Sequence, residues 1–488
     1  MDPRLTLALL AGRGASWISR RFGRGGGTVL PGHVVPRIDP GALHTIASRL
    51  SAGSLLVSGT NGKTTTTRMV AQIASRAALA PIHNRSGANL MTGIVAALAA
   101  HSDLSGKPQG DLGIFEVDEA HVPVATAALQ PRVLALTNIF RDQLDRYGEV
   151  DLVARTWRHA IQSLRGDATL VLNADDPIVA QLGEDARCRV IYFGVEDTSI
   201  GSAQVPHEAD KRLCHRCGAR IQYTWSYYGH VGHYRCDSCG WRRPEPAVRI
   251  ISASTRRDGG SDLVIDAEGT RLEVPLRLAG LYNACNAAAA VTICRSVGIA
   301  DEHIVGGLAE FEAVFGRQER IAIGDGSIIL SLVKNPVGFN QVLQALFGSE
   351  FRAPSSESEA RGGESKIPEL GTRDSKPETL LVIAINDLFA DGTDVSWLWD
   401  VDFEMLAGRP LKIVCSGLRA HDMALRLKYA EIQNEVVDVE PRIEAAIDRA
   451  IHAAQGGAQI VICPTYTAML AVRSELQRRG AVAPFWED

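Results

Sequence analysis

The chain has 488 residues, of which 45% are hydrophobic and 22% are charged, and its formal net charge is −5. This length accommodates about three domains of ordinary size, and the acidic balance argues against a general nucleic-acid-binding protein. No window of about 18 consecutive apolar residues predicts a transmembrane helix. Nine cysteines, an odd number in a long chain, do not make the pattern of a disulfide framework, so we expect a cytoplasmic protein.

The N-terminal segment, residues 1–45, predicts an apolar and basic helix over residues 5–22, then a glycine-rich loop and a proline-containing lead-in. Its apolar stretch is too short for a signal peptide and lacks a cleavage-site pattern. Such a helix either packs against the neighbouring domain or contacts a membrane surface or an anionic lipid. Both alternatives stay open at this point.

A phosphate-binding loop is predicted between an apolar run at residues 55–58 and a helix at residues 64–80. The loop consists of Gly59, Thr60, Asn61, Gly62, Lys63, Thr64 and Thr65. The glycines let backbone N–H groups turn towards a phosphate, and the start of the helix adds partial positive charge. Lys63 can reach a β- or γ-phosphate, and the hydroxyl of Thr64 can bind Mg²⁺. The spacing is two residues shorter than that of the common P-loop, so the motif alone indicates a nucleotide site of an unusual kind.

From residue 53 onward, apolar strand candidates alternate with helical patterns, which indicates βα units on a mainly parallel sheet. The strand candidates are residues 55–58, 112–117, 133–137, 169–172 and 190–193. Three carboxylates, Glu116, Asp118 and Glu119, come at the end of the second candidate. Ligands of open α/β sheets bind at this end of the strands, and carboxylate oxygens suit Mg²⁺.

Residues of about 203–275 interrupt the alternation with short strand candidates and two C-x-x-C-G turns. The turns supply Cys214, Cys217, Cys236 and Cys239. Four thiolates from two such turns form a closed tetrahedral Zn²⁺ site, which has no open position for a substrate and is therefore structural. The aromatic residues between the turns either pack the ribbon or stack on nucleic-acid bases.

A domain boundary is expected near residue 320. Beyond it, strand candidates at residues 328–333, 380–385, 411–415 and 459–462 alternate with helices, which predicts a second, Rossmann-like α/β domain over residues 321–488. Residues 353–377 are rich in Ser, Glu, Gly, Arg and Lys and predict a disordered surface insertion. The loop after the second of these strands carries Asp391 and Asp394.

The short phosphate loop with Thr60 and Asn61 inside it resembles the ATP loop of the Mur ligases, which join amino acids to carboxylates. Segments similar to others of this family follow in its order, at residues 137–145, 172–177, 280–287 and 316–320. The resemblance implies a Mur-ligase-like ATP-binding domain over residues 46–320. It also implies that Thr64 and Glu116 bind magnesium, and that Asn283 and Arg317 position the nucleotide.

Departures from the common Mur pattern point to one branch of the family. Gln143 stands at the place of a metal-binding histidine, and Ser331 and Lys334 replace the aspartate and histidine of the acceptor segment. These features, together with the inserted Cys₄ ribbon, resemble the MurT subunits of lipid II isoglutaminyl synthases. The resemblance implies amidation of the α-carboxylate of D-glutamate in the lipid II stem peptide to D-isoglutamine, through an acyl phosphate.

In that branch, ammonia comes from a GatD-type glutamine amidotransferase subunit, and we expect such a heterodimer here. The resemblance implies catalytic roles for Lys63 and Glu116, and for one acid at the ammonia end, Asp391 in preference to Asp394. It also implies peripheral contact with a membrane-borne substrate, hence a cytoplasmic location at the inner face of the membrane. Two alternatives remain: a Mur- or folylpolyglutamate-type ligase that adds an amino acid, and a nucleotide-dependent zinc-ribbon protein without enzyme activity that binds nucleic acid.

Overall fold

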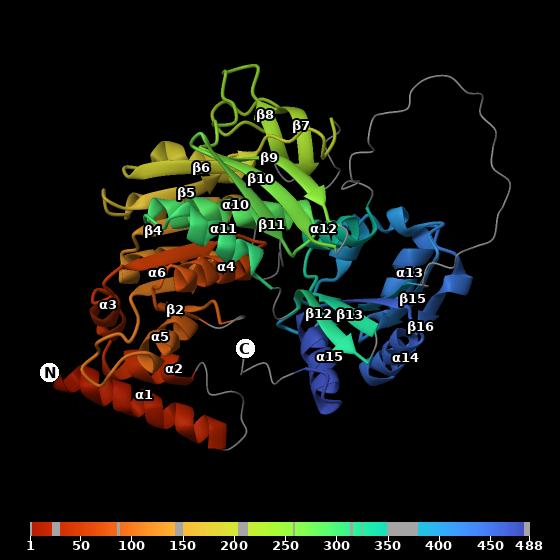
Figure 1. Cartoon of the computed structure of the whole chain (residues 1–488), viewed down its shortest axis with the longest axis horizontal. Coiled ribbons are helices and arrows are strands. Elements are labelled where there is room, and N and C mark those ends of the chain that lie inside the picture. The colour runs from red at the N-terminus through yellow and green to blue at the C-terminus, as the bar shows by residue number, and fades with distance from the viewer. Residues whose placement is uncertain are drawn as a thin grey trace. The chain divides into compact units, whose positions relative to one another are not determined.

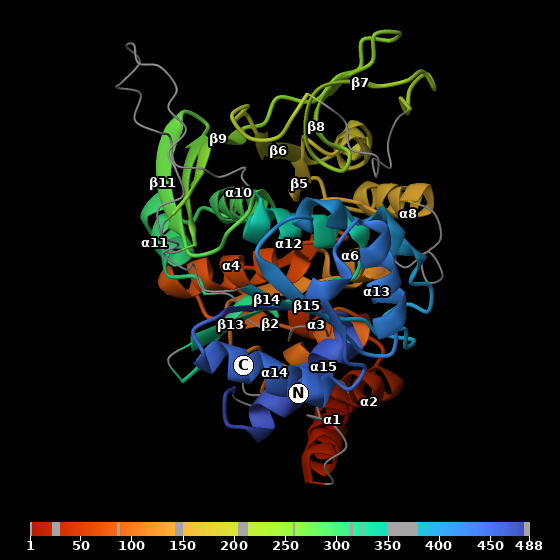
Figure 2. The same ribbon diagram turned by 90° about the vertical axis from the view of Figure 1, so that its right-hand side faces the viewer.

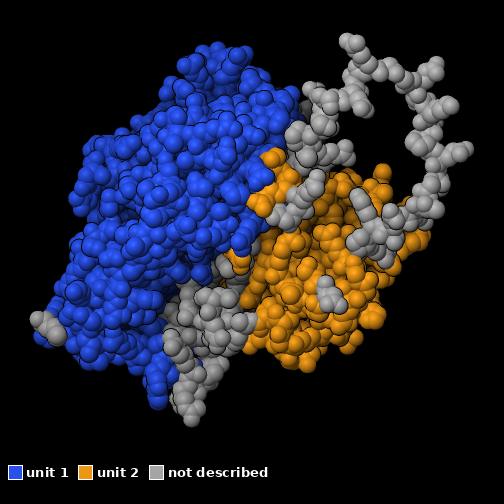
Figure 3. All heavy atoms as spheres, in the orientation of Figure 1, with its two compact units in different colours: residues 1–253, 258–311 blue, residues 254–257, 312–488 orange. Residues whose placement is uncertain are grey.

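The computed structural model describes residues 2–21, 30–84, 88–141, 150–203, 213–256, 259–312, 316–324, 326–348 and 379–482. They divide into two compact units, residues 1–253 with 258–311 and residues 254–257 with 312–488 (Figure 3). The predicted insertion at residues 353–377 and the segment that holds Gln143 lie outside the described residues.

Within the described residues, the first unit is built on a nine-stranded sheet (Figure 1). In spatial order, its strands are β11 (Thr270–Leu276), β10 (Ser261–Ala267), β9 (Val248–Thr255), β6 (Arg189–Val195), β5 (Thr169–Asn173), β4 (Val133–Leu136), β1 (Ser54–Ser58), β3 (Leu112–Glu116) and β2 (Pro81–His83). The neighbours from β2 through to β9 pair in parallel, whereas β10 and β11 are antiparallel. The mainly parallel sheet that the alternating pattern predicted is thereby confirmed.

Helices connect these strands and cover the sheet. They are α1 (Pro3–Arg21), α2 (Leu30–Ile38), α3 (Ala42–Ala47), α4 (Lys63–Arg76), α5 (Met91–Ala100), α6 (Val122–Leu129), α8 (Val150–Gln162), α9 (Pro177–Ala180), α10 (Leu281–Ser296) and α11 (Asp301–Ala309), with the 3₁₀ turns η1 (Glu119–His121) and η2 (Gln181–Asp185). Helix α4 packs against α10 and α11, and α6 packs against α3 and α8. Among the described residues, no helix has both the length and the apolar character that a membrane span requires.

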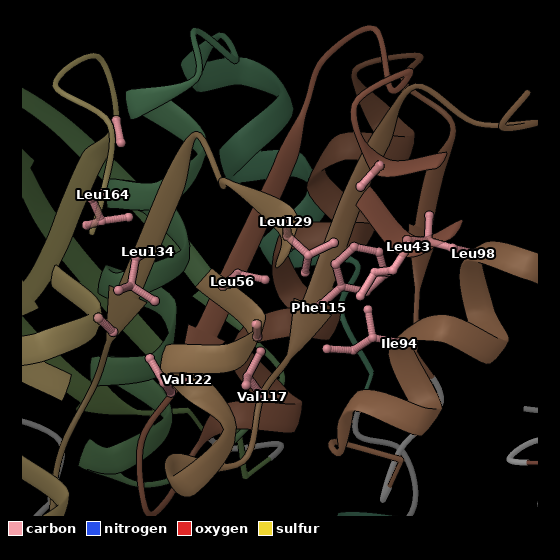
Figure 4. Close-up of a cluster of buried hydrophobic side chains, with 14 of the residues drawn as sticks. Leu43, Leu56, Ile94, Leu98, Phe115, Val117, Val122, Leu129, Leu134 and Leu164 are labelled. Carbon is pink, nitrogen blue, oxygen red and sulfur yellow. The ribbon is translucent and has the colours of Figure 1, made fainter. Parts of the chain in front are cut away.

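The strands at the centre of this sheet are buried on both faces, as helices on either side of a parallel sheet require. All residues of β1, β3 and β4 are buried. Leu56, Phe115 and Leu134 belong to one core cluster with Leu43, Ile94 and other side chains of the surrounding helices (Figure 4). Because side chains alternate along a strand, the neighbours of Leu56 in β1 point to the opposite face.

The parallel register brings the carboxyl ends of three central strands to one edge of the sheet. Val57 of β1 is level with Glu116 of β3, and Ser58 is level with Leu136 of β4. The loops that follow these strands therefore lie side by side, and they contain the phosphate loop, the three carboxylates and the segment that begins at Thr137.

A separate two-stranded antiparallel sheet, β7 (Gln222–Tyr228) and β8 (Val231–Arg235), carries the cysteine turns. The part of the chain that stands apart from the main sheet is smaller than the insertion expected over residues 203–275. The reason is that β9 pairs in parallel with β6, with Val248 beside Phe193, so that β9, β10 and β11 extend the main sheet.

The second unit contains, within its described part, a six-stranded sheet. In spatial order, the strands are β12 (Arg317–Ile323), β13 (Gly326–Ser331), β17 (Gln459–Pro464), β14 (Thr379–Ala384), β15 (Leu411–Ser416) and β16 (Val437–Val439). The helices are α12 (Pro336–Phe347), α13 (Ala420–Tyr429), α14 (Ile443–Gln455) and α15 (Tyr466–Arg478), with η3 (Ser396–Asp400), η4 (Phe403–Leu406) and η5 (Asn434–Val436). Within the described residues, β12 and β13 pair antiparallel and the other neighbouring strands of this sheet pair in parallel. Alternate residues of β14 belong to two separate hydrophobic clusters, Leu381 and Ile383 to one and Leu380 and Val382 to the other. The predicted second α/β domain is confirmed.

The contacts divide the chain at residue 312, whereas the sequence placed the boundary at residue 320. The antiparallel pairing of β12 with β13 explains why residues 317–323 belong to the second unit. The N-terminal segment, which the sequence predicted as a separate region, belongs to the first unit. Its helices α1 and α2 pack on each other, and both contact α5.

Candidate active site

Two glycines shape the loop between β1 and α4. Gly59 has a φ of 148° and Gly62 has a φ of 85°, which residues with a Cβ rarely adopt. Space also requires glycine, because a Cβ at Gly59 would lie 2.1 Å from Oγ1 of Thr137 and one at Gly62 would lie 2.1 Å from Oδ1 of Asn286. The loop therefore turns tightly into α4, and the first-turn N–H groups of this helix form an end that favours anions.

Lys63 is the first residue of α4, and its side chain is buried. Its Nζ donates to the carbonyl oxygen of Gly59 and forms an ion pair with Oε2 of Glu119 at 3.0 Å. The two side chains are 7% and 8% exposed, so the ion pair is enclosed by protein. Glu119 thereby holds the ammonium group of Lys63 near the start of the helix, where a phosphate-binding loop has its lysine.

Thr64 and Glu116 lie in contact at the ends of neighbouring strands. Oγ1 of Thr64 donates to Oε2 of Glu116 at 2.8 Å, and both side chains are buried. Asn84 holds the backbone of Glu116 on both sides, because its Nδ2 donates to the carbonyl oxygen and its Oδ1 accepts from the N–H, each at 2.9 Å. A hydroxyl and a carboxylate in this arrangement are the hard oxygen ligands that Mg²⁺ prefers. Their role as magnesium ligands stays a prediction.

The loop after β4 holds the phosphate loop in place. The N–H of Asn61 donates to Oδ1 of Asn138 at 2.8 Å, and Nδ2 of Asn138 donates back to the carbonyl oxygen of Asn61 at 2.9 Å. The N–H of Phe140 donates to Oγ1 of Thr60 at 2.9 Å. These bonds hold the backbone of the loop between β1 and α4 against the segment after β4.

The start of α10 approaches the same loop. Oδ1 of Asn286 accepts from Oγ1 of Thr66 at 3.4 Å, and its Nδ2 donates to Oδ1 of Asn283 at 3.4 Å. Asn283 itself donates to the carbonyl oxygen of Ala279 at 2.8 Å. Asn283, which we predicted to position the nucleotide, is thus linked through Asn286 to the helix that carries Lys63 and Thr64.

The four predicted metal ligands come together at the cysteine turns. The sulfur atoms of Cys214, Cys217, Cys236 and Cys239 all lie within 4.8 Å of one another. The cluster can hold one metal ion, and four sulfur ligands suit a tetrahedral site.

The hairpin turn between β7 and β8 contacts the segment that holds the phosphate loop. The ring of His230 lies 4.8 Å from the ring of Phe140. Nε2 of His230 lies 3.3 Å from Oδ1 of Asp176, and both side chains are fully buried. The other oxygen of Asp176 accepts from the N–H of Ile139 at 2.9 Å. His230 of the ribbon is therefore linked to the phosphate loop through its contacts with Asp176 and Phe140.

A second buried acid anchors the base of the ribbon. Oδ1 of Asp175 accepts from Nε of Arg243 at 2.6 Å, and Oδ2 accepts from the N–H of Val195 at 2.8 Å. Burial raises the pKa of Asp175, and the positive charge of Arg243 opposes this rise. Nη1 of Arg243 also donates to Glu196 at 2.7 Å. Residues 172–177, which resemble a nucleotide-pocket segment, thus use these acids to bind the ribbon.

In the second unit, Arg317 begins β12. Gln318 next to it has a φ of 60°, and the register with β13 shifts between Arg317 and Glu319. Glu319 accepts from the N–H of Gly316 at 2.8 Å and pairs with the guanidinium of Arg473. The acid of this turn therefore fixes its backbone to α15, and Arg317 stays a predicted nucleotide ligand.

Asp391 and Asp394 have different surroundings. Asp391 is buried and accepts from the N–H of Thr467 at 2.7 Å and from its hydroxyl at 2.5 Å. Asn386 donates to the same hydroxyl at 2.9 Å. Asp394 is exposed and accepts from the N–H of Ser396 at 2.8 Å, a bond that lowers the pKa of Asp394. Asp391 therefore joins the loops after two adjacent strands, β14 and β17, whereas Asp394 shapes only its own turn.

Several residues of the site were not singled out as site residues from the sequence. They are Asn84, Glu119, Asn138, Asp176, His230 and Asn286. Glu119, Asn138, Asp176 and Asn286 lie in segments that the sequence did indicate, so these segments were a usable signal. The roles of Asn84 and His230 depend on contacts between distant segments, for which the sequence has no local signal.

Comparisons with known proteins agree with this geometry. Residues 57–233 match the family model for the Mur ligase middle domain, and residues 362–469 match the one for the MurT ligase C-terminal region. The chain is 33% identical over 485 residues to the lipid II isoglutaminyl synthase (glutamine-hydrolyzing) subunit MurT of Streptococcus pneumoniae, with 99% of each chain covered. It is 30% identical over 473 residues to the subunit of the same name from Staphylococcus aureus strain N315, with 97% of each covered.

Solved structures share the fold at lower identity. MurF from Acinetobacter baumannii superposes with a TM-score of 0.64 at 17% identity, over 92% of this chain and 81% of that one. Folylpolyglutamate synthase from Mycobacterium tuberculosis, complexed with ADP and AMPPCP, superposes with a TM-score of 0.58 at 16% identity, over 89% of this chain and 93% of that one. The predicted Mur-ligase-like fold is confirmed.

Proposed function

Because this chain belongs to the MurT family of Mur-type ligases, we propose that it amidates the α-carboxylate of D-glutamate in the stem peptide of lipid II. The observation that carries the proposal is the position of the buried Thr64–Glu116 contact at the hydrogen-bonded phosphate loop, in a chain of this family. Carboxylate activation by ATP needs both of these parts.

In the proposed reaction, one oxygen of the carboxylate takes the γ-phosphoryl group of ATP, and ADP is released. The nitrogen of ammonia then bonds to the carbonyl carbon, the bond from that carbon to the phosphate oxygen breaks, and a proton leaves the nitrogen. Lys63 and the N–H groups of the loop neutralise charge on the phosphate oxygens, where it must be stabilised during transfer. Mg²⁺ bound at Thr64 and Glu116 would add to this neutralisation.

The relatives are named as subunits of a glutamine-hydrolyzing enzyme, and we infer a GatD-type glutaminase as the partner of this chain. An enzyme that uses ammonia has no amino-acid side chain to hold. This accounts for Ser331 and Lys334 in the acceptor segment, while Asn335 still caps α12 through the N–H of Gly338 at 2.7 Å. Asp391 would act at the ammonia end, supported by its burial and its position at the carboxyl edge of the second sheet.

The cysteine cluster would hold one structural Zn²⁺. Its fit rests on the four mutually close sulfur atoms. The Cys217→Ser variant should contain less than one zinc per chain by metal analysis and should unfold at lower temperature. The Cys188→Ser variant serves as the control, because this thiol is only partly buried and lies outside the cluster.

The test of the function uses the purified chain with lipid II, ATP and ammonium chloride. We expect ADP and a stem peptide that is lighter by the difference between a hydroxyl and an amino group, and we expect neither with Lys63→Ala. Turnover of ATP only when an amino acid is added would overturn the proposal in favour of an amino-acid-adding ligase. Salt-sensitive binding of nucleic acid without turnover would favour the nucleic-acid-binding alternative.

Asp391→Asn and Asp394→Asn form a matched pair for the ammonia end. With glutamine and the glutaminase subunit, we expect amidation to be lost in the first variant and retained in the second. Ammonium chloride separates two roles of Asp391. It restores amidation if Asp391 completes the catalytic apparatus of the partner, and fails to restore it if Asp391 orients ammonia. Equal activity of both variants with glutamine would remove Asp391 from the mechanism.

A further inference from the structure

Helix α1 has two apolar stripes, and only one of them packs against the protein. Leu5, Ala8 and Leu9 are buried, and α1 packs mainly on α2 and also contacts α5. A Cβ at Gly12 would lie 2.8 Å from a methyl group of Val35, so the helices approach closely here. Figures 1 and 2 show α1 at the periphery of the first unit.

The second stripe points away from the protein. Its side chains are Leu7, Leu10, Trp17 and Ile18, which are 59%, 49%, 67% and 50% exposed. At about 100° of rotation per residue, these four positions fall within an arc of about 100° on the helix, opposite the buried stripe. The helix therefore presents four large apolar side chains on one exposed arc, and apolar side chains gathered on one face mark interaction sites.

The charge of this part of the chain is strongly positive. Residues 3–38 include six arginines and no aspartate, glutamate or lysine, in a chain whose net charge is −5. Arg4 and Arg13 donate to the carbonyl oxygens of Ile38 and Ser102. Arg37 donates likewise to the carbonyl oxygen of His33. These acceptors are neutral, so these bonds do not cancel the charges of the three arginines.

We propose that the outward stripe of α1, together with the exposed Arg4, Arg13 and Arg37, binds the surface of a bilayer that contains anionic phospholipid. An apolar stripe sinks to the level of the acyl chains while arginines bind the negative headgroups, and tryptophan favours this boundary. The helix lies on the membrane and does not cross it, since no helix of the described residues is suited to span one. The exposure and charge of α1 do not depend on the proposed function. The role of the membrane surface does rest on that function, because binding there would bring the active site to a lipid-linked substrate.

The experiment measures sedimentation of the full chain with vesicles of phosphatidylcholine alone and of phosphatidylcholine with phosphatidylglycerol in equal amounts, without substrate. We expect binding to the anionic vesicles that weakens as salt screens the charges. The variant with Leu7→Ser, Trp17→Ser and Ile18→Ser should partition about tenfold more weakly, because it removes most of the apolar area that would be buried. Val124→Ser with Leu152→Ser is the matched control, since these side chains are also exposed on helices of the same unit.

The stripe variant must keep the melting temperature of the parent chain, which its exposed positions predict. Equal vesicle binding by the parent chain and the stripe variant would overturn the proposal. It would also be overturned if neither protein bound vesicles and the parent chain formed a dimer that the variant did not form. That result would assign the stripe to contact with a second copy of the chain. Amidation of lipid II in detergent separates this inference from the proposed function. Activity in detergent without vesicle binding by the parent rejects only the membrane surface, whereas vesicle binding without any amidation rejects only the function.

Discussion

The hydroxyl of Thr64 donates to a carboxylate oxygen of Glu116 at 2.8 Å, which joins the first turn of α4 to the end of β3 inside the protein. The two residues are far apart in the sequence, and the parallel pairing of β1 with β3 brings them together. Asn84 then fixes the backbone of Glu116. This arrangement limits the positions that a bound cation can take, so a substitution of Glu116 tests the predicted magnesium site directly.

Glu116→Gln should lower the turnover of ATP by about a hundredfold, or about 2.7 kcal/mol, because the amide keeps the shape but lacks the negative charge that holds Mg²⁺. Half-saturation by Mg²⁺ should also move to higher concentration, as measured by a magnesium titration at saturating ATP. Asp118→Asn is the control, since Asp118 accepts from the N–H of Ala120 at the start of η1. A normal magnesium titration in Glu116→Gln would contradict the assigned role.

Lys63→Ala should lose activity and also stability, because it leaves Glu119 buried without its partner. Removing one member of such a pair costs about 3–5 kcal/mol. The double variant Lys63→Ala with Glu119→Gln should regain much of the stability and none of the activity. Urea unfolding and ATP turnover measure the two effects separately. If the double variant were as unstable as Lys63→Ala, the ion pair would not be the cause.

His230→Ala should weaken the binding of ATP several-fold while the chain keeps its zinc. The substitution removes the ring that lies against Phe140 and Asp176. Phe140 donates to Thr60 of the phosphate loop, and Asp176 accepts from the neighbouring Ile139. Titration calorimetry with ATP and metal analysis give the two readouts. His233→Ala is the control, because this histidine of the same ribbon contacts the carbonyl oxygen of Val195 instead. Equal affinities in the two variants would contradict a positioning role for His230.

Glu475 should make the stability of the chain sensitive to acid. The hydrogen bond from Arg478 lowers the pKa of Glu475 from 4.5 to about 2, with a further contribution from Arg479. Because the folded state holds the charged form more tightly than the unfolded chain, the stabilisation is present above pH 4.5 and is lost as the pH falls towards 2.

The measurement is the urea midpoint of the parent chain and of Glu475→Gln across this pH range. The two midpoints should differ near neutral pH and converge in acid. Glu435→Gln, an exposed position in η5, should follow the parent chain. A difference that stays constant down to pH 2 would show that the carboxylate of Glu475 is not the titrating group.

The sequence by itself determined the parts of this protein that depend on local pattern. The glycine spacing predicted the phosphate loop, because backbone conformation near Gly59 and Gly62 is a property of the loop itself. Alternating apolar runs predicted the central strands, and the two C-x-x-C-G turns predicted the cysteine cluster. Each of these signals is contained within a short stretch of chain.

Only the tertiary structure decided which distant groups meet. It paired Lys63 with Glu119, set His230 against Asp176, and joined β9 to β6 so that the main sheet extends beyond the ribbon. It also decided which apolar stripe of α1 is covered and which is exposed. Pairing and burial are set by the packing of whole elements, and a helix with two apolar stripes can pack through either one, so these features have no signature in the local sequence.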